Sequence, residues 1–137
     1  MSRPARSPSN RVKYRVLVVE DTPDTREFLR LLLEAEGYEV TTAADGLAAV
    51  GEALREPPDA IIMDMSLPGL DGYNAARLIR REPALADVPL IACTAFNRWE
   101  WRGKAIAAGF DAFMTKPIET QRLTATLAAL LARRARP

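Results

Sequence analysis

The chain of 137 residues contains no histidine and a single cysteine, Cys93. Without histidine, the chain itself cannot supply a histidine general base, a histidine metal ligand or a phosphohistidine carrier. One cysteine cannot form an internal disulfide, which fits a reducing compartment, so we expect a cytoplasmic protein. Because Cys93 ends an apolar segment, we expect it to be an inert thiol of the core.

Long hydrophobic runs are also missing. No apolar segment approaches the ~20 residues that a transmembrane helix needs. Residues 1–10 contain arginine, proline and serine but lack the apolar centre of a secretory signal. We therefore expect no contact with a membrane. A chain of this length is the size of one domain, and its 48% hydrophobic content is ample for one core.

Charge is distributed unevenly along the chain. Seven basic residues lie within residues 1–13 and 133–137, so the formal net charge of +1 becomes −6 for the segment between them. We expect residues 1–12 to be a disordered basic tail, 13–132 to be one domain and 133–137 to be a basic C-terminal end. The basic ends could touch nucleic acid, but solvated ends are the simpler interpretation. An acidic domain is not typical of a nucleic-acid-binding surface, so we expect no direct DNA binding.

Five short apolar segments alternate with segments of helical spacing. The expected strands are Tyr14–Val19, Tyr38–Ala43, Asp59–Asp64, Val88–Cys93 and Ala112–Thr115. The expected helices begin near Pro23, Gly46, Gly72, Arg98 and Ile118. Their apolar faces include Phe28, Leu29, Leu33, Leu47, Leu54, Leu78 and Ile79. Such strict alternation predicts an α/β domain in which helices cover both faces of a parallel sheet.

Reactive residues follow four of the expected strands: Glu20–Asp21, Asp64, Thr94 and Lys116. In an open parallel sheet, ligands bind outside the carboxyl ends of the strands, so we expect these groups to meet in one crevice. Carboxylates crowded this closely repel one another unless a cation lies among them. Oxygen ligands of this kind suit Mg²⁺, completed by water and phosphate. The pattern predicts metal-assisted phosphoryl chemistry, in which an ionised aspartate can attack phosphorus.

Each of these residues also has a purely structural interpretation. Asp64 could cap a loop, and the acidic pair could complement the dipole of the helix that follows, although Thr22 already offers a cap. Thr94 suits a strand by propensity alone. Lysine is usually solvated, but at this strand end Lys116 would pair with Asp64 or a phosphoryl oxygen. Its bond to the following proline is a candidate cis peptide, which would turn the lysine inward.

The segments Val16–Asp21, Met63–Gly72, Thr94–Ala95 and Lys116–Pro117 together resemble the receiver domain of response regulators in two-component signalling. The resemblance is to a stand-alone, CheY-like receiver and covers about residues 14 to 132. It implies a flavodoxin-like, doubly wound fold. In that fold a single five-stranded parallel sheet, in the order 2-1-3-4-5, is flanked by five helices.

The resemblance also implies a phosphorylation site and a metal site. Asp64 matches the aspartate that accepts the phosphoryl group. Glu20 and Asp21 match the acidic pair that holds Mg²⁺ together with Asp64, with Asp21 the more direct ligand and Mn²⁺ a possible substitute. Ser66 matches the residue whose main-chain carbonyl reaches the metal. Glu20 is one methylene longer than aspartate, which could place it on a metal-bound water.

Three further residues match the phosphoryl-binding and switch positions of the family. Thr94 matches the hydroxyl residue that hydrogen-bonds the phosphoryl group, Lys116 matches the lysine that pairs with it, and Phe113 matches the switch aromatic. Phe113 lacks the hydroxyl of a tyrosine at this position. The implied donor is a histidine kinase or a histidine-containing phosphotransfer protein. Such a switch is not an enzyme for other substrates, because it promotes only its own phosphorylation and dephosphorylation.

The implied output is a change in a protein-interaction surface, because no output domain is expected in this chain. We expect the downstream target to bind the face formed by the fourth helix, fifth strand and fifth helix, with Trp99, Arg102 and Phe113 on that surface. Helical spacing places Trp101 inward and Trp99 outward. We expect Phe96 to affect the access of water to the site. The protein is expected to be a monomer or a phosphorylation-dependent dimer.

Two alternatives remain open at this point. A phosphohydrolase of the haloacid-dehalogenase type shares the sheet, Mg²⁺ and an aspartyl phosphate. It usually has a second acid two residues after the nucleophile, where this chain has Ser66, and it needs a cap for which 137 residues leave little room. A receiver-like binding module that is never phosphorylated would have no need of Asp64, Thr94 and Lys116 together.

Overall fold

The computed structural model describes residues 13–95 and 99–135, without the side chains of residues 99–101 and 135. The expected disordered tail and Phe96 lie outside the described residues, as do the last two residues of the expected basic C-terminal end. The side chains of Trp99 and Trp101 also lie outside them, so their expected orientations stay predictions.

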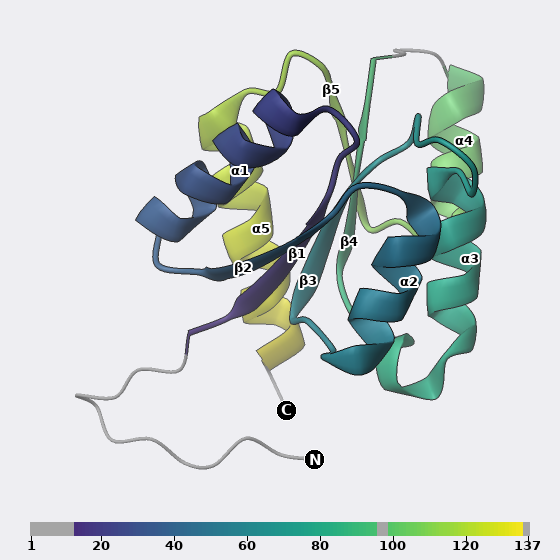
Figure 1. Ribbon diagram of the computed structural model, residues 1–137, viewed down its shortest axis with the longest axis horizontal. Coiled ribbons are helices and arrows are strands. Elements are labelled where there is room, and N and C mark those ends of the chain that lie inside the picture. Colours follow the sequence, from purple (N-terminus) through teal and green to yellow (C-terminus); the bar gives the residue numbers. More distant parts are fainter. Residues whose placement is uncertain (1–12, 96–98, 136–137) are drawn as a thin grey trace.

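Five parallel strands form one sheet in the order β2-β1-β3-β4-β5. The strands are β1 (Arg15–Val19), β2 (Glu39–Ala43), β3 (Ala60–Asp64), β4 (Leu90–Thr94) and β5 (Ala112–Thr115). The helices are α1 (Pro23–Ala35), α2 (Gly46–Arg55), α3 (Gly72–Arg81), a 3₁₀ turn η1 (Pro83–Leu85), α4 (Trp99–Ala108) and α5 (Thr120–Ala135). Helices α1 and α5 cover one face of the sheet, and α2, α3 and α4 cover the other (Figure 1). The predicted doubly wound α/β fold and its strand order are confirmed.

Two apolar clusters, one on each face of the sheet, explain why the central strands β1, β3 and β4 are largely apolar. Val18 and Ile62 pack with the buried leucines of α1 and α5, whereas Leu17 and Met63 belong to the cluster under α2, α3 and α4. Successive residues of a strand face opposite sides. Because both sides are covered by helices, every residue of β3 and β4 is buried and these strands read as continuous hydrophobic runs.

Four side chains that were predicted to lie on the apolar, core-facing sides of helices are instead exposed to solvent. Phe28 is 52% exposed, Leu47 69%, Leu54 44% and Leu78 36%. In α2 the buried positions are small residues, namely Gly46, Ala49 and Ala53. Small side chains let this helix lie close to the sheet, so the larger leucines next to the narrow buried stripe remain outside it.

Side-chain caps and a glycine define several element ends. Asp45 and Asp71 each accept a hydrogen bond from the backbone N–H three residues later, at 2.8 and 2.9 Å, and so begin α2 and α3. Gly37, after α1, has a φ of 97°, which glycine adopts without steric cost. Strand β4 begins at Leu90 rather than Val88, because the N–H of Val88 donates to a carbonyl of η1. None of the helices in the described ranges has the length and apolar character that crossing a bilayer requires.

Candidate functional site

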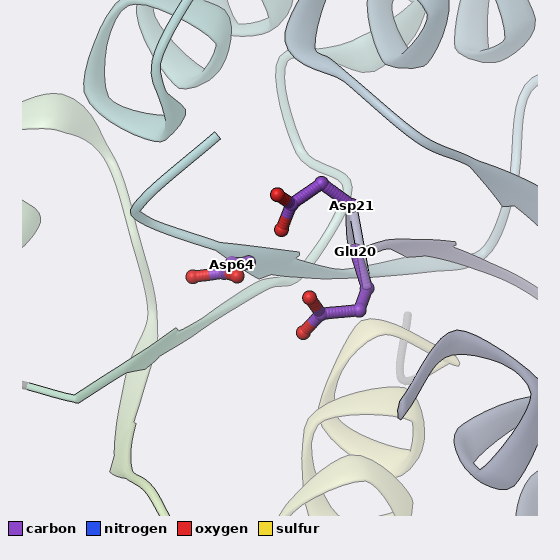
Figure 2. A group of neighbouring side chains, drawn as sticks. All are labelled: Glu20, Asp21 and Asp64. Atoms are coloured by element: carbon purple, nitrogen blue, oxygen red, sulfur yellow. The ribbon is translucent and has the colours of Figure 1, made fainter. Parts of the chain in front are cut away.

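Three carboxylates meet at the carboxyl edge of the sheet, as the sequence predicts. Oxygen atoms of Glu20, Asp21 and Asp64 all lie within 4.8 Å of one another. Figure 2 shows Glu20 and Asp21 reaching from the end of β1 towards Asp64 at the end of β3. Glu20 is 2% exposed and Asp64 4%, whereas Asp21 is exposed to solvent. Two of the three charges are therefore held in the protein interior, where a counter-charge is needed.

Strand register places these groups. Val19 of β1 pairs with Met63 of β3, so the residues that follow them, Glu20 and Asp64, leave the sheet side by side. The N–H of Glu20 also donates to the last carbonyl of β2 at 3.0 Å. Because parallel strands end at the same edge, residues separated by more than forty positions in the chain become neighbours.

Lys116 supplies positive charge to this group of carboxylates. Its Nζ lies 3.0 Å from Oδ2 of Asp64 and 3.2 Å from Oε1 of Glu20. The N–H of Lys116 donates to the carbonyl of Thr94 at 2.7 Å, which ties the end of β5 to the end of β4. The Lys116–Pro117 bond is cis, and the lysine points inward, as the sequence predicts. Although burial opposes its charge, hydrogen bonds and charge contacts with Asp64 and Glu20 raise the pKa of Lys116 above the ordinary lysine value.

The environment of Glu20 favours its neutral form more than water does. Burial is the largest cause of its raised pKa, and the neighbouring charge of Asp64 acts in the same direction. Hydrogen bonds from Lys116 and from the N–H of Thr22, at 3.0 Å from Oε2, oppose that shift. The expectation that Thr22 caps α1 is half right. It is the N-cap residue by backbone conformation, but its side chain makes no capping hydrogen bond.

The loop between β3 and α3 completes the surroundings of Asp64. The N–H of Ser66 donates to Oδ1 of Asp64 at 2.9 Å, so each carboxylate oxygen of Asp64 has a donor. This loop lies against the start of α2: a Cβ added to Gly46 would lie 2.1 Å from the carbonyl oxygen of Leu70. A Cβ on Gly72 would similarly meet the carbonyl oxygen of Asp64 at 2.8 Å. Glycine at these two positions allows the loop to lie close to the site.

Thr94 and Phe113 occupy the neighbouring strands. Thr94 ends β4, is 1% exposed and directly follows Cys93, which pairs with Asp64 across the sheet. Phe113 lies on β5 and is half-buried. The guanidinium carbon of Arg102, from α4, lies 5.6 Å from the centre of its ring. Arg102 is exposed, as expected for a surface residue.

One residue near the acidic pair was not predicted from the sequence. Nη1 of Arg26, one turn into α1, donates to the carbonyl oxygen of Glu20 at 2.9 Å and lies 3.5 Å from that of Asp21. It thus contacts the main chain that carries both carboxylates. A basic residue five positions after an acidic pair was the only signal in the sequence.

The donor set fits a small divalent cation. Glu20, Asp21 and Asp64 offer hard oxygen atoms, and three carboxylates against the single ammonium of Lys116 leave a formal charge of −2. Mg²⁺ prefers such oxygen ligands and retains several waters, which an exposed residue such as Asp21 permits. The group is therefore suited to Mg²⁺ on charge and on ligand type.

Comparison with known proteins agrees with this site and fold. The family model described as "Response regulator receiver domain" matches residues 16–128. The "DNA-binding dual master transcriptional regulator RpaA" of Synechocystis sp. is 32% identical over 119 residues, which are 87% of this chain and 49% of RpaA. The chain thus spans about half the length of that regulator.

Two solved structures have the same fold. The receiver domain of the sensor histidine kinase PA1611 of Pseudomonas aeruginosa, with a magnesium ion coordinated in its active-site cleft, has a TM-score of 0.82 and 37% identity. The alignment covers 88% of this chain and 99% of that one. The chemotaxis protein CheY4 of Vibrio cholerae has a TM-score of 0.83 and 28% identity, covering 87% and 99% of the two chains. Fold, acidic site and matched sequence lead to one conclusion: this chain belongs to the response regulator receiver domain family, whose members are signalling switches of two-component systems.

Proposed function

We propose that this chain accepts a phosphoryl group on Asp64 in the presence of Mg²⁺ and thereby switches a protein-interaction surface. The observation that carries the proposal is the buried Asp64 carboxylate, held between the ammonium of Lys116 and the carboxylates of Glu20 and Asp21. An isolated buried carboxylate is costly. One placed among a cation and further metal ligands is instead prepared to react with an anionic phosphoryl group.

In the proposed reaction, an oxygen of Asp64 attacks the phosphorus of a phosphohistidine on a partner protein. An O–P bond forms, the N–P bond breaks, and the histidine nitrogen keeps the electron pair. Lys116 lies 3.0 Å from Oδ2 of Asp64 and is placed to stabilise the charge of the transferred group. The Thr94 hydroxyl donates a hydrogen bond to it. Positioning and electrostatics supply the catalysis, and no side chain needs to act as a base.

Mg²⁺ would be held by Glu20, Asp21 and Asp64 with the main-chain carbonyl of Ser66, and Mn²⁺ has the same ligand preference. When bound, the metal neutralises the phosphoryl oxygens and draws the acidic group together. Ser66 contributes separately through its N–H, which orients Oδ1 of Asp64. The domain that performs this chemistry spans residues 13–132, and it promotes only its own phosphorylation and dephosphorylation.

The phosphohistidine that donates the phosphoryl group lies outside this sequence, which contains no histidine. A histidine kinase or a histidine-containing phosphotransfer protein has the required chemistry. Beside the site, a cavity of about 290 Å³ is lined by α1 and by the segment from Lys116 to Ile118. Phe28 on its wall is 52% exposed, and Leu31 on the same helix is 53% exposed. These apolar side chains are available to contact a donor protein in the cytoplasm.

Phosphorylation would be transmitted through Thr94 and Phe113 to the face formed by α4, β5 and α5. Movement of the Thr94 hydroxyl towards the phosphoryl group leaves space into which the ring of Phe113 can turn, which biases an existing two-state equilibrium. Arg102 is exposed on α4 and would belong to the surface that then changes, and the sequence predicts the same of Trp99. The switched form is a dimer if that face binds a second copy of the chain, and a monomer if it does not.

The test is the intact mass of the protein after incubation with acetyl phosphate and Mg²⁺. A phosphoryl adduct should form on the wild type and be absent from Asp64→Asn and from samples loaded with EDTA. If the folded wild type gives no adduct, beryllofluoride titration with intrinsic fluorescence tests for a short-lived acyl phosphate. Absence of both signals would overturn the proposed function.

A further inference from the structure

Three large apolar side chains are exposed where α2 and α3 lie side by side (Figure 1). Leu47 and Leu54 of α2 are 69% and 44% exposed, and Leu78 of α3 is 36% exposed. Single exposed leucines are common on protein surfaces, whereas a contiguous group of them indicates a binding surface. The position of each leucine around its helix axis decides which of these descriptions applies.

Both leucines of α2 lie on the side of the helix that faces α3. They are seven residues apart, which places them within about 20° of each other around the helix axis. Val50, between them, is half-buried and packs against the apolar cluster under α2, α3 and α4. Helix α3 lies between α2 and α4 in this layer (Figure 1), so the flank of α2 that carries Val50 and the two leucines is the flank beside α3.

Leu78 faces α2 from the neighbouring helix. Arg80, two residues later, extends away from α2 and donates to the carbonyl of Gly109 at 2.7 Å and to Oδ2 of Asp111 at 2.9 Å, beyond the end of α4. Two successive positions of an α-helix span about 200°. Leu78 therefore lies on the flank of α3 opposite to Arg80, which is the flank beside α2, and the three leucines form one exposed apolar strip.

Two arginines of α3 border this strip. Arg77 and Arg81 are both exposed and lie one helical turn apart. Neither makes a hydrogen bond or an ion pair within the ranges that the structure describes, and Glu82, which follows Arg81 in the chain, is no exception. Arg55 of α2, by contrast, is paired with Glu52 of the same helix. The positive charge beside the strip is thus available to a ligand.

We propose that this surface, here called the α2–α3 face and defined by Leu47, Leu54, Leu78, Arg77 and Arg81, binds an acidic amphipathic helix of a partner protein. Large apolar side chains of the partner helix cover the three leucines and remove them from water. Two carboxylates one turn apart on the same helix pair with the two arginines. The α2–α3 face is separate from the surface that the proposed function assigns to the switch, so this inference goes beyond that function.

Charge selects this occupant over the alternatives. The residues between the two basic ends carry a formal charge of −6, so a basic face is a local reversal that favours an acidic partner. A symmetric dimer uses the same patch on both copies and would bring the arginines of the two copies towards each other. An anionic bilayer recruits clusters of about four to eight basic residues, whereas this face has two.

The test is selection of random twelve-residue peptides, displayed on phage, against the full chain. Enriched peptides are synthesised with a fluorescent label, and their Kd is measured by anisotropy. We expect aspartate or glutamate at helical spacing, combined with leucine, phenylalanine or tryptophan. The double variant Arg77→Gln/Arg81→Gln should raise the Kd at least about tenfold, and Leu47→Gln/Leu54→Gln should do likewise. All four side chains are exposed, so both variants should keep the urea midpoint of the wild type.

Matched controls separate a specific contact from a general effect of charge or apolar surface. Arg133→Gln removes an exposed arginine of α5, and Leu31→Gln removes a leucine of α1 that is 53% exposed. Both should leave the Kd unchanged. The variant Arg77→Lys/Arg81→Lys keeps the positive charge and should retain most of the affinity.

Several results would overturn the proposal for the α2–α3 face. These are a lack of enriched peptides, enriched peptides without acidic residues, and equal binding to the arginine double variant. Self-association that Leu47→Gln/Leu54→Gln abolishes would assign the face to a second copy, and sedimentation with phosphatidylglycerol vesicles that Arg77→Gln/Arg81→Gln abolishes would assign it to a lipid surface. The mass test for an adduct on Asp64 is independent of these measurements, so the failure of either proposal leaves the other intact.

Discussion

Replacing Lys116 with methionine tests the electrostatic account of the site most directly. The ammonium lies 3.0 Å from Asp64 and 3.2 Å from Glu20, and both carboxylates are almost fully buried. At an effective dielectric constant of about 20, each contact is a gross attraction of about 5 kcal/mol. Most of this is offset by the cost of removing the charges from water. Because the lysine side chain is 29% exposed, we expect Lys116→Met to lower the free energy of unfolding by about 2–3 kcal/mol at pH 7 without metal.

The pH dependence of that loss has a definite sign. Burial raises the pKa of Glu20 in the folded protein, so its protonation stabilises the fold at low pH, and this contribution is lost as the pH rises through the raised value. Lys116 lowers that pKa, so its removal raises it further. The deficit of Lys116→Met relative to wild type should therefore shrink as the pH falls from 7 to 5. Mg²⁺ should restore more stability to the variant than to wild type, because it supplies the missing positive charge.

The assay is urea denaturation in EDTA at pH 7 and pH 5, repeated with Mg²⁺. Lys104→Met is the matched control, because Lys104 lies exposed on α4, and its effect should stay within about 0.5 kcal/mol. In the Asp64→Asn background the cost of Lys116→Met should fall, since one of the two buried charges is already gone. A variant as stable as wild type at pH 7, or a deficit that neither pH nor Mg²⁺ changes, would refute this reasoning.

Three further predictions concern residues around the site. Arg26→Met should weaken Mg²⁺ binding about tenfold by calorimetry, the lower end of the loss expected when a group that orients metal ligands is removed. Arg30→Met should leave Mg²⁺ binding unchanged, because in the described part of the chain the Arg30 guanidinium pairs with carboxylates of α1 itself. Gly46→Ala should cost about 1–3 kcal/mol in thermal unfolding, because its Cβ would lie 2.1 Å from a carbonyl oxygen of the β3–α3 loop. A Cβ added to Gly51 would have no atom within 4 Å, so Gly51→Ala should stabilise α2 by up to about 1 kcal/mol. If Gly46→Ala proved more stable than Gly51→Ala, the close packing at Gly46 would be contradicted. Burial raises the pKa of Cys93 to about 12, so a thiol reagent at pH 8 should modify it only at the rate of unfolding, and rapid modification of the native protein would show that it is accessible.

The sequence predicted the surroundings of a residue correctly where the local pattern of apolar and polar residues determines them. Continuous apolar runs before Glu20 and Asp64 indicated strands covered on both sides, and the ends of parallel strands share one edge whatever the details of packing. The convergence of Glu20, Asp21, Asp64 and Lys116 follows from that rule alone. The same reasoning correctly assigned Cys93 to the core, where it is 2% exposed.

Helix phase was less predictable. Spacing indicated that Phe28 and Leu47 were part of apolar stripes, but it did not show how wide the buried part of each stripe is. That width depends on how closely the helix approaches the sheet, which the small residues of α2 decide. The side-chain partners of main-chain atoms were equally out of reach. Apart from its distance to the acidic pair, nothing in the sequence distinguishes Arg26, bonded to the carbonyl of Glu20, from Arg30 one turn later, which pairs with surface carboxylates.

The sequence by itself determined the order of the elements, the parallel sheet and the chemical groups at its carboxyl edge, because these depend on short-range pattern and on a topology with few alternatives. Only the tertiary structure decided which of the carboxylates are buried, that one ammonium contacts both Glu20 and Asp64, and that exposed leucines of α2 and α3 lie beside exposed arginines of α3. Burial and charge pairing arise between segments far apart in the chain. They depend on helix packing and strand register, which no local pattern encodes.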